Sequence, residues 1–171
     1  DWSLVAIGNS HSAAIKTDST LWSWGSNVEL QLGIGPGNSS PKQIGTLVTW
    51  NLVSASLSHS LAVKTDSTLW AWGSGGGGIG RMGDGTTIDK SSPIQIGPHA
   101  DWLKVSAGSS HSFAVKTDFT LWAWGNGASA IGRLGDGTTL SKSSPAQVGT
   151  LADWAIVATA DTHSIARKTD S

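Results

Sequence analysis

The 171-residue chain contains no cysteine and no tyrosine, and only 13% of its residues are charged. Without cysteine, neither disulfide bonds nor thiolate metal sites can form. No apolar run approaches the roughly 20 residues that a membrane-spanning helix needs, and no signal peptide opens the chain. The formal net charge is -1 and the basic residues are not clustered. The sequence therefore predicts no membrane span and no binding to nucleic acid, which would call for a basic face.

The sequence does contain a long repeated phrase. HSAAIKTDSTLWSWG at residues 11–25 returns as HSLAVKTDSTLWAWG at 59–73, as HSFAVKTDFTLWAWG at 111–125, and in part as HSIARKTDS at 163–171. The spacing of the leading histidines is 48, 52 and 52 residues, a period typical of repeat architectures. All ten tryptophans keep this register: Trp2, Trp50, Trp102 and Trp154 lead the copies, and the pairs Trp22/Trp24, Trp70/Trp72 and Trp122/Trp124 follow.

Each copy alternates apolar and polar residues in short runs, which predicts four strands. In the third copy we expect them at 103–107, 112–116, 120–124 and 145–148. The phrase Thr-Asp-Xaa-Thr predicts a tight hairpin between the second and third strands. Its third position favours a residue that tolerates positive φ, and the residues there are Ser19, Ser67, Phe119 and Ser171.

Four antiparallel strands in about 50 residues match one blade of a β-propeller. We therefore predict an all-β fold with three full repeats at 1–49, 50–100 and 101–152, and a partial fourth at 153–171. Stacked blades would bury the tryptophans between them. The chain starts at Asp1 rather than Met and its fourth copy is unfinished, so we expect an incomplete ring cut from a longer chain. Further repeats or a second copy of the chain would complete it.

The combination of W-x-x-V-S-A-G-x-x-H-S, A-V-K-T-D, L-W-A-W-G, R-L-G, G-D-G-T-T and S-P-x-Q-I-G resembles the regulator of chromosome condensation repeat family. The resemblance covers essentially the whole chain and implies a propeller, commonly of seven blades. Kelch repeats have a similar period, but they typically carry a double glycine followed by Tyr and Trp. This chain has no Tyr, and its Gly75–Gly78 run occurs in one copy.

The repeated histidines His11, His59, His111 and His163 could be bases or metal ligands. Because they recur in every copy, we interpret them as structural, and we expect no metal and no cofactor. The Gly-Asp-Gly-Thr-Thr segments offer one carboxylate each, too few for a calcium loop, so we interpret them as turns. No serine, base and acid form a set confined to one place, which favours a scaffold over an enzyme.

The residues that differ between copies gather in one long connection. Loops that vary on a regular frame often form binding surfaces. The first copy has Val28, Glu29 and Leu30 there, the second Gly75–Gly78 and the third 128–130. Arg81 and Arg133 follow the loop where the first copy has Gln31. We expect these residues to form a binding loop.

The sequence thus favours a non-enzymatic module that binds a protein partner or packs in an assembly. Two alternatives stay open. Abundant Trp and low charge would suit a secreted carbohydrate-binding propeller, and the family's name-giving member implies guanine-nucleotide exchange on a small GTPase. Low charge and the near absence of Glu are similar to bacterial secreted or surface repeat proteins, so we expect an extracellular or cell-surface location.

Overall fold

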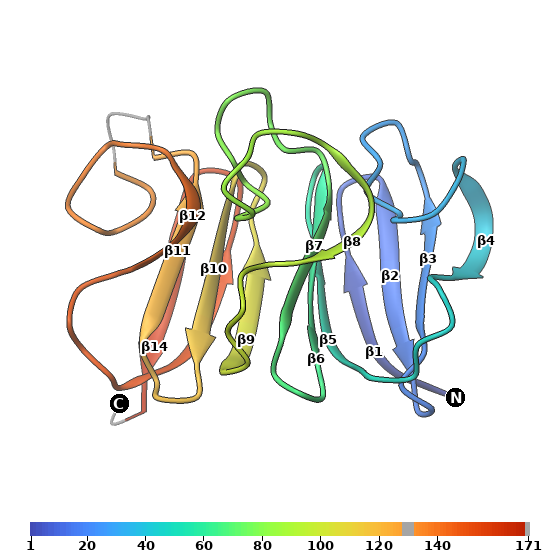
Figure 1. The fold of residues 1–171 in the computed structure, drawn as a ribbon, viewed down its shortest axis with the longest axis horizontal. Helices are drawn as coiled ribbons and strands as arrows, with labels where there is room; N and C mark the ends of the chain where they lie inside the picture. The colour runs from blue at the N-terminus through green and yellow to red at the C-terminus, as the bar shows by residue number, and fades with distance from the viewer. Residues whose placement is uncertain (128–131, 170–171) are drawn as a thin grey trace.

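Four antiparallel sheets stand side by side in an open arc in the computed structural model, which describes residues 1–127 and 132–169 (Figure 1). Blade 1 contains β1 (Trp2–Ile7), β2 (His11–Lys16), β3 (Leu21–Gly25) and β4 (Asn38–Gln43). Blade 2 contains β5 (Trp50–Ala55), β6 (His59–Lys64), β7 (Leu69–Gly73) and β8 (Lys90–Gln95). Blade 3 contains β9 (Trp102–Ala107), β10 (His111–Lys116), β11 (Leu121–Gly125) and β12 (Lys142–Gln147). Blade 4 contains β13 (Trp154–Thr159) and β14 (Ser164–Lys168).

Each sheet is a meander in which every strand pairs with the strand that follows it. The first strands form the inner wall of the arc, because β1 contacts β5, β5 contacts β9 and β9 contacts β13. The last strands β4, β8 and β12 are the outer edges. The predicted all-β fold of three four-stranded blades and a partial fourth is confirmed. None of the described residues belongs to a helix long and apolar enough to cross a membrane.

The fourth strand of blade 3 begins earlier than predicted. It was expected at 145–148 in the third copy, but β12 spans Lys142–Gln147. Gly125 pairs with Lys142, and the register shifts between Ala123 and Gly125. The polar Lys-Ser-Ser segment carries no apolar alternation, so only its backbone pairing with β11 reveals it as strand.

The hairpin between the second and third strands has the predicted geometry. Ser19, Ser67 and Phe119 all have φ of 62°, which confirms the expectation; Ser171 lies outside the described residues. In the first copy the Asp18 carboxylate accepts hydrogen bonds from the backbone N–H and the hydroxyl of Thr20. The Thr20 Oγ1 then accepts one from the Trp22 indole, at 2.8 Å. The phrase T-D-x-T-L-W thus forms one connected turn.

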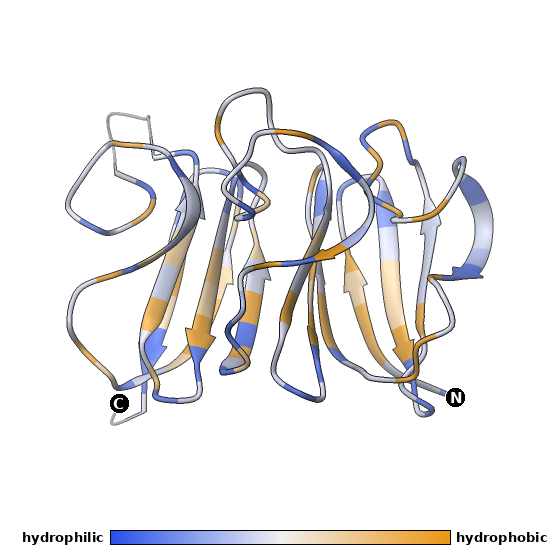
Figure 2. Ribbon diagram, in the orientation of Figure 1, coloured by the Kyte–Doolittle hydropathy of each residue, from blue (hydrophilic) through white to orange (hydrophobic). Residues whose placement is uncertain are grey.

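The core lies between neighbouring blades, and Figure 2 shows the apolar stretches that follow the strands. One face of β2, β6 and β10 packs against the next blade, and the tryptophan pairs of β7 and β11 face the preceding blade. Trp50 and Trp102 are 2% exposed, whereas Trp2, on the outer side of blade 1, is 46% exposed. A tryptophan of this repeat is therefore buried only where a preceding blade covers it.

Each tryptophan group also holds a lysine. In blade 2 the Trp50 ring meets the Trp70 and Trp72 rings at centroid distances of 5.8 and 6.3 Å. The Lys64 Nζ lies 3.5 Å from the Trp70 centroid, a cation–π contact. In blade 3 the matching Lys116 also pairs with Asp101 at 3.2 Å.

Candidate functional site

The long connections and the short turns before the histidines lie at one end of the sheets, toward the top of Figure 1, and we call this end the loop face. It contains the described parts of the connections 26–37, 74–89 and 126–141, and the turns 8–10, 56–58 and 108–110. The tight hairpins and the segments that join one blade to the next lie at the opposite end. The loop face therefore presents the residues that differ most between the repeats.

The structure brings three of the five predicted loop residues together. Val28, Glu29 and Arg81 surround a cleft of about 340 Å³ between blades 1 and 2. The rest of its lining is mostly serine and glutamine, with one exposed leucine: Ser10, Ser26, Gln31, Leu57 and Ser58. Val28 is 87% exposed and stands at the rim.

The other two predicted residues lie elsewhere. Leu30, at φ of 61°, turns away from this cleft and lines a separate one against Ser91 and Ser92 of β8. Arg133 lies one blade further on, where it lines a different cleft, of about 580 Å³, together with Asp161 and residues of the turns before the histidines. Residues 128–130 of the third loop lie outside the described residues.

Arg81 is fixed in place by both of its neighbours. Its Nη1 donates to the Ser58 hydroxyl of its own blade and, at 2.9 Å, to the Ser109 carbonyl of the next blade. Burial lowers the pKa of Arg81 from its ordinary value, and the nearby Glu29 and Asp89 carboxylates oppose that shift. The side chain keeps its charge, since an arginine pKa starts far above neutral pH.

The residues at the positions matching Arg81 also donate a hydrogen bond to a serine of their own blade. The Arg133 Nη1 donates to Ser110 at 2.6 Å, and the Gln31 Nε2 donates to Ser10 at 3.3 Å. The Gln31 Oε1 also accepts the Glu29 N–H. From the sequence Gln31 stood only as a counterpart of the arginines, and its serine partner was missed. The sequence feature that could have revealed this hydrogen bond is a long polar side chain at the matching position of each copy.

The backbone carbonyl at this position is the main link to the next blade. The Gln31 carbonyl accepts hydrogen bonds from the Trp72 indole at 2.8 Å and from the Ser60 hydroxyl at 3.0 Å. The Arg81 carbonyl accepts the same pair from Trp124 and Ser112, both at 2.9 Å. The first two connections are thus anchored to the second and third strands of the following blade.

The repeated histidines complete this link. His11, His59 and His111 place Nε2 at 2.9, 2.9 and 2.8 Å from Ser60, Ser112 and Ser164 of the next blade. Since Ser60 and Ser112 give their only hydroxyl hydrogen to a carbonyl, the histidine Nε2 must be the donor. We call this unit, histidine to serine to loop carbonyl, the junction relay.

Burial keeps these three histidines neutral. It lowers the pKa of His11 to about 4, of His59 to about 3 and of His111 to about 4. Among the described residues no group of three or more His, Asp or Glu side chains could hold a metal ion. His163, the matching histidine of the fourth copy, is exposed, as is His99 in the segment between blades 2 and 3.

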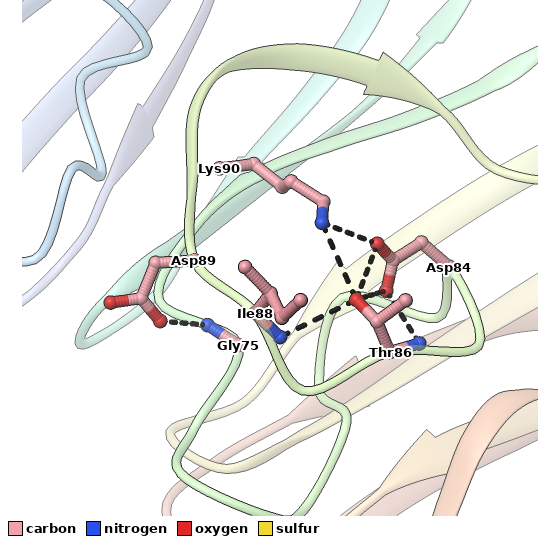
Figure 3. A network of polar contacts seen from close by, with 6 residues as sticks. All are labelled: Gly75, Asp84, Thr86, Ile88, Asp89 and Lys90. Atoms are coloured by element: carbon pink, nitrogen blue, oxygen red, sulfur yellow. Dashed lines mark hydrogen bonds and ion pairs between the residues drawn. The ribbon is translucent and has the colours of Figure 1, made fainter.

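The Gly-Asp-Gly-Thr-Thr segment forms a closed polar network, shown in Figure 3. The Asp84 carboxylate accepts the Thr86 N–H at 3.0 Å and pairs with the Lys90 Nζ at 3.0 Å. Burial acts to raise the pKa of Asp84, but the hydrogen bonds from Lys90 and Thr86 outweigh it, and the pKa lies below its usual value. The carboxylate therefore stabilises its own loop, and Gly75 is tied to the same loop through Asp89.

Sequence comparison finds the regulator of chromosome condensation (RCC1) repeat at residues 18–63 and 66–115, and a second model of that repeat at 2–31 and 102–129. The human protein named "Probable E3 ubiquitin-protein ligase HERC6" is 31% identical over 165 residues, which are 90% of this chain and 16% of that protein. The Arabidopsis thaliana protein named "RCC1 domain-containing protein RUG3, mitochondrial" is 27% identical over 126 residues, 71% of this chain and 28% of that protein.

Two solved structures show the same fold. Prp20p from Saccharomyces cerevisiae superposes with a TM-score of 0.83 at 22% identity, over 96% of this chain and 43% of that one. Human WBSCR16 superposes with a TM-score of 0.82 at 20% identity, over 96% of this chain and 44% of that one. The chain thus spans less than half the length of each of these four proteins.

Proposed function

Because the chain belongs to the RCC1 repeat family, we propose that it is a non-enzymatic interaction module whose loop face binds a protein partner. One observation carries the proposal. Residues that differ between the repeats, Val28 and Glu29 from blade 1 and Arg81 from blade 2, surround one cleft. The residues that recur in the repeats are used to hold the blades together.

The chemistry of the cleft suits a protein surface. Val28 and Leu57 offer exposed apolar contact at its rim, and Glu29 and Arg81 offer charges of both signs. Because its hydrogen bonds to Ser58 and Ser109 already hold Arg81, little side-chain freedom would be lost on binding, which favours affinity.

A structural relative supports protein binding by this fold. Prp20p is described with its binding properties to Gsp1p and histones. Those partners are stated for that protein, and this chain spans 43% of its length. For this chain we propose only the same class of partner, a protein.

Enzymatic functions receive less support. The serines and histidines that could form a nucleophile and base are hydrogen-bonded to each other across the blades, in the junction relay. The relative HERC6 is named a probable ligase, but this chain matches 16% of it. Nucleotide exchange on a small GTPase stays an alternative that rests on the family name alone. The absence of nucleic-acid binding stays a prediction from the unclustered charge.

Carbohydrate binding is also less favoured, because it would need exposed indole faces. At the junctions between blades Trp50, Trp72, Trp102 and Trp124 are buried. Quenching of tryptophan fluorescence by a panel of glycans would revive this alternative. We keep an extracellular or cell-surface location as part of the proposal, supported by the low charge; protease treatment of intact producing cells would test it, since only an exterior protein is cut.

Site-specific photo-crosslinking tests the loop face. A photoreactive residue replaces Val28 in one sample and Val48, on the opposite end and 59% exposed, in a matched control. We expect a discrete adduct from position 28 and none from position 48. The captured protein is then purified and titrated, and we expect Val28→Asp with Glu29→Lys to weaken its binding at least tenfold. Equal adducts from both positions, or unchanged affinity in the double variant, would refute the proposal.

A further inference from the structure

Blade 2 extends an arginine across its junction with blade 3, and blade 1 has no matching arginine. The Arg81 Nη1 donates to the Ser58 hydroxyl of its own blade and, at 2.9 Å, to the Ser109 carbonyl of the next blade. The matching residue of blade 1 is Gln31, whose shorter side chain donates to Ser10 of its own blade, at 3.3 Å. The junction between blades 1 and 2 therefore lacks a cationic link that the next junction has.

The carbonyl that corresponds to the end of this link is that of Leu57. Leu57 and Ser109 hold the same position, two residues before the histidine of their copies. The Leu57 carbonyl accepts no hydrogen bond from the residues that the structure describes. Leu57 also lines the cleft of about 340 Å³ between blades 1 and 2, together with Gln31 and Ser10. The cleft thus corresponds to the place that a guanidinium takes at the next junction.

A second cation beside Arg81 is compatible with this fold. At the junction between blades 2 and 3, two arginines bind neighbouring residues of one turn. Arg81 binds the Ser109 carbonyl, and Arg133 binds the Ser110 hydroxyl at 2.6 Å. At the junction between blades 1 and 2, Arg81 is the counterpart of Arg133 and binds Ser58. The position beside it is the one that matches a second guanidinium.

The first connection also carries a negative charge that the second lacks at this place. Glu29 lines the cleft, and no ion pair among the described residues includes it. Residues 75–80 of the second connection are glycines and one isoleucine. Val28 and Leu57 are exposed at the rim, where they can cover the aliphatic stem of a long cationic side chain. The charge and the apolar rim therefore both suit an incoming cation.

We propose that this cleft binds an arginine side chain of the protein partner. Its guanidinium donates to the Leu57 carbonyl and the Ser10 hydroxyl, and its charge pairs with Glu29. These contacts repeat at the first junction what Arg81 does at the second. The inference rests on the proposed function, because it names the side chain through which a partner engages the loop face.

Arginine suits these acceptors better than lysine. A carbonyl, a hydroxyl and a carboxylate around one cleft call for donors that point in several directions, and a guanidinium offers five N–H groups in a planar fork. A lysine ammonium is a compact and more strongly hydrated charge, so it loses more on leaving water. The cleft should therefore discriminate between the two cations.

An NMR titration of the full 171-residue chain with Nα-acetyl-arginine methylamide tests the inference. We expect saturable shifts of the Ser10, Leu57 and Ser58 amides, with a dissociation constant on the order of 1 mM. The matching lysine compound should bind at least tenfold more weakly, and Glu29→Gln should weaken binding of the arginine compound about fivefold. Absence of saturable shifts at these amides, or equal binding of the two compounds, would overturn the inference.

A matched pair of variants places the arginine compound in the cleft. Gln31→Arg supplies the guanidinium from the chain itself and should abolish binding. Gln147→Arg makes the same change at an exposed position of β12 and should leave binding unchanged. The Gln31 carbonyl keeps its bonds to Trp72 and Ser60 in the variant, because they involve only its backbone. Equal effects of the two variants would contradict the inference. If Gln31→Arg unfolds by circular dichroism, Glu29→Lys decides, since a cation at this exposed position must abolish binding.

The partner captured through position 28 separates this inference from the proposed function. Gln31→Arg should weaken binding of that partner at least tenfold. A partner that binds Gln31→Arg as tightly as the wild-type chain would overturn the inference and leave the proposed function intact. Equal adducts from positions 28 and 48, together with binding of the arginine compound that Gln31→Arg abolishes, would support the arginine cleft and refute the loop face as the partner surface.

Discussion

The junction between blades 2 and 3 and the outer ends of the arc are made of the same residues with different surroundings. His59 is fully buried and bonded to Ser112, whereas His163 is exposed. Trp102 is 2% exposed under blade 2, and Trp2, its counterpart on the outer side of blade 1, is 46% exposed. The difference shows that a side chain of this fold is buried because it lies at a junction between two blades, and not because of its position within the repeat. Each repeat supplies half of two interfaces and completes neither.

The stability lost when a residue is substituted should also depend on whether it lies at a complete junction or at an end of the arc. A side chain at a complete junction touches two blades, so its loss leaves a cavity and unpaired polar groups. The matching side chain at an end touches one blade and partly faces water. Equivalent substitutions at a junction and at an end should therefore differ in their cost.

Acid should destabilise the complete junctions most. His11, His59 and His111 have folded pKa values of about 4, 3 and 4, below the 6.5 expected in the unfolded chain. The unfolded state therefore binds more protons, and stability is lost as pH falls through 6.5 toward 4. By linkage each histidine costs about 2 kcal/mol at pH 5, or roughly 6 kcal/mol together. Urea denaturation from pH 7.5 to 5 measures this.

One variant checks the origin of that slope. His59→Gln should remove about a third of the pH dependence, because His59 is one of the three buried histidines. The aspartates with lowered pKa values, such as Asp18 and Asp66, lose their stabilising charge only below about pH 4, outside this window. A flat profile between pH 7.5 and 5 would show that the junction relay does not hold neutral histidines.

Removing a tryptophan should cost most where two blades meet. Trp72 is fully buried and bonded to Gln31, so Trp72→Ala should lower the free energy of unfolding by about 3–5 kcal/mol. Trp24→Ala, the same change on the outer side of blade 1, should cost about half as much or less, because that ring is only half-buried. Equal losses in chemical denaturation would contradict the comparison.

Glycines give a sharper version of the same comparison. Gly83→Ala and Gly135→Ala both place a Cβ at positive φ, +85° and +69°, which costs about 1 kcal/mol. Only the Gly83 variant also collides with Trp124. We expect it to lose about 1–3 kcal/mol more than the Gly135 variant.

The weakest effect that we expect is a gain in blade 2. Thr49 stands where Asp101 pairs with Lys116 in blade 3, and burial lowers the pKa of Lys64 beside it. Thr49→Asp should therefore add an ion pair to the cation–π contact and stabilise the chain by up to about 1 kcal/mol. The gain should shrink in high salt; Asp101→Thr is the reverse variant and should lose a similar amount.

The sequence alone predicted the repeat, the four strands of each full repeat and the positive φ of Ser19, Ser67 and Phe119. These features repeat at fixed spacing and depend on local chemistry, so periodicity and turn residues reveal them. The start of β12 at Lys142 was missed, because its pairing with Gly125 leaves no apolar pattern. Among the loop residues, Leu30 was grouped with Val28 and Glu29, but its own positive φ turns it into another cleft.

The blade itself follows from the sequence: its strand order, its hairpins and the register of its tryptophans are all dictated by local propensity and short-range pairing. Which copies of a residue are buried, and what they bond, follows from the stacking of the blades. The carbonyls of Gln31 and Arg81 accept hydrogen bonds from residues 29 to 43 positions later in the chain. A backbone carbonyl has no sequence signature, because every residue has one. The partner of such a carbonyl comes close only when two blades stack, since a single blade has no second surface against which to bury its own apolar face.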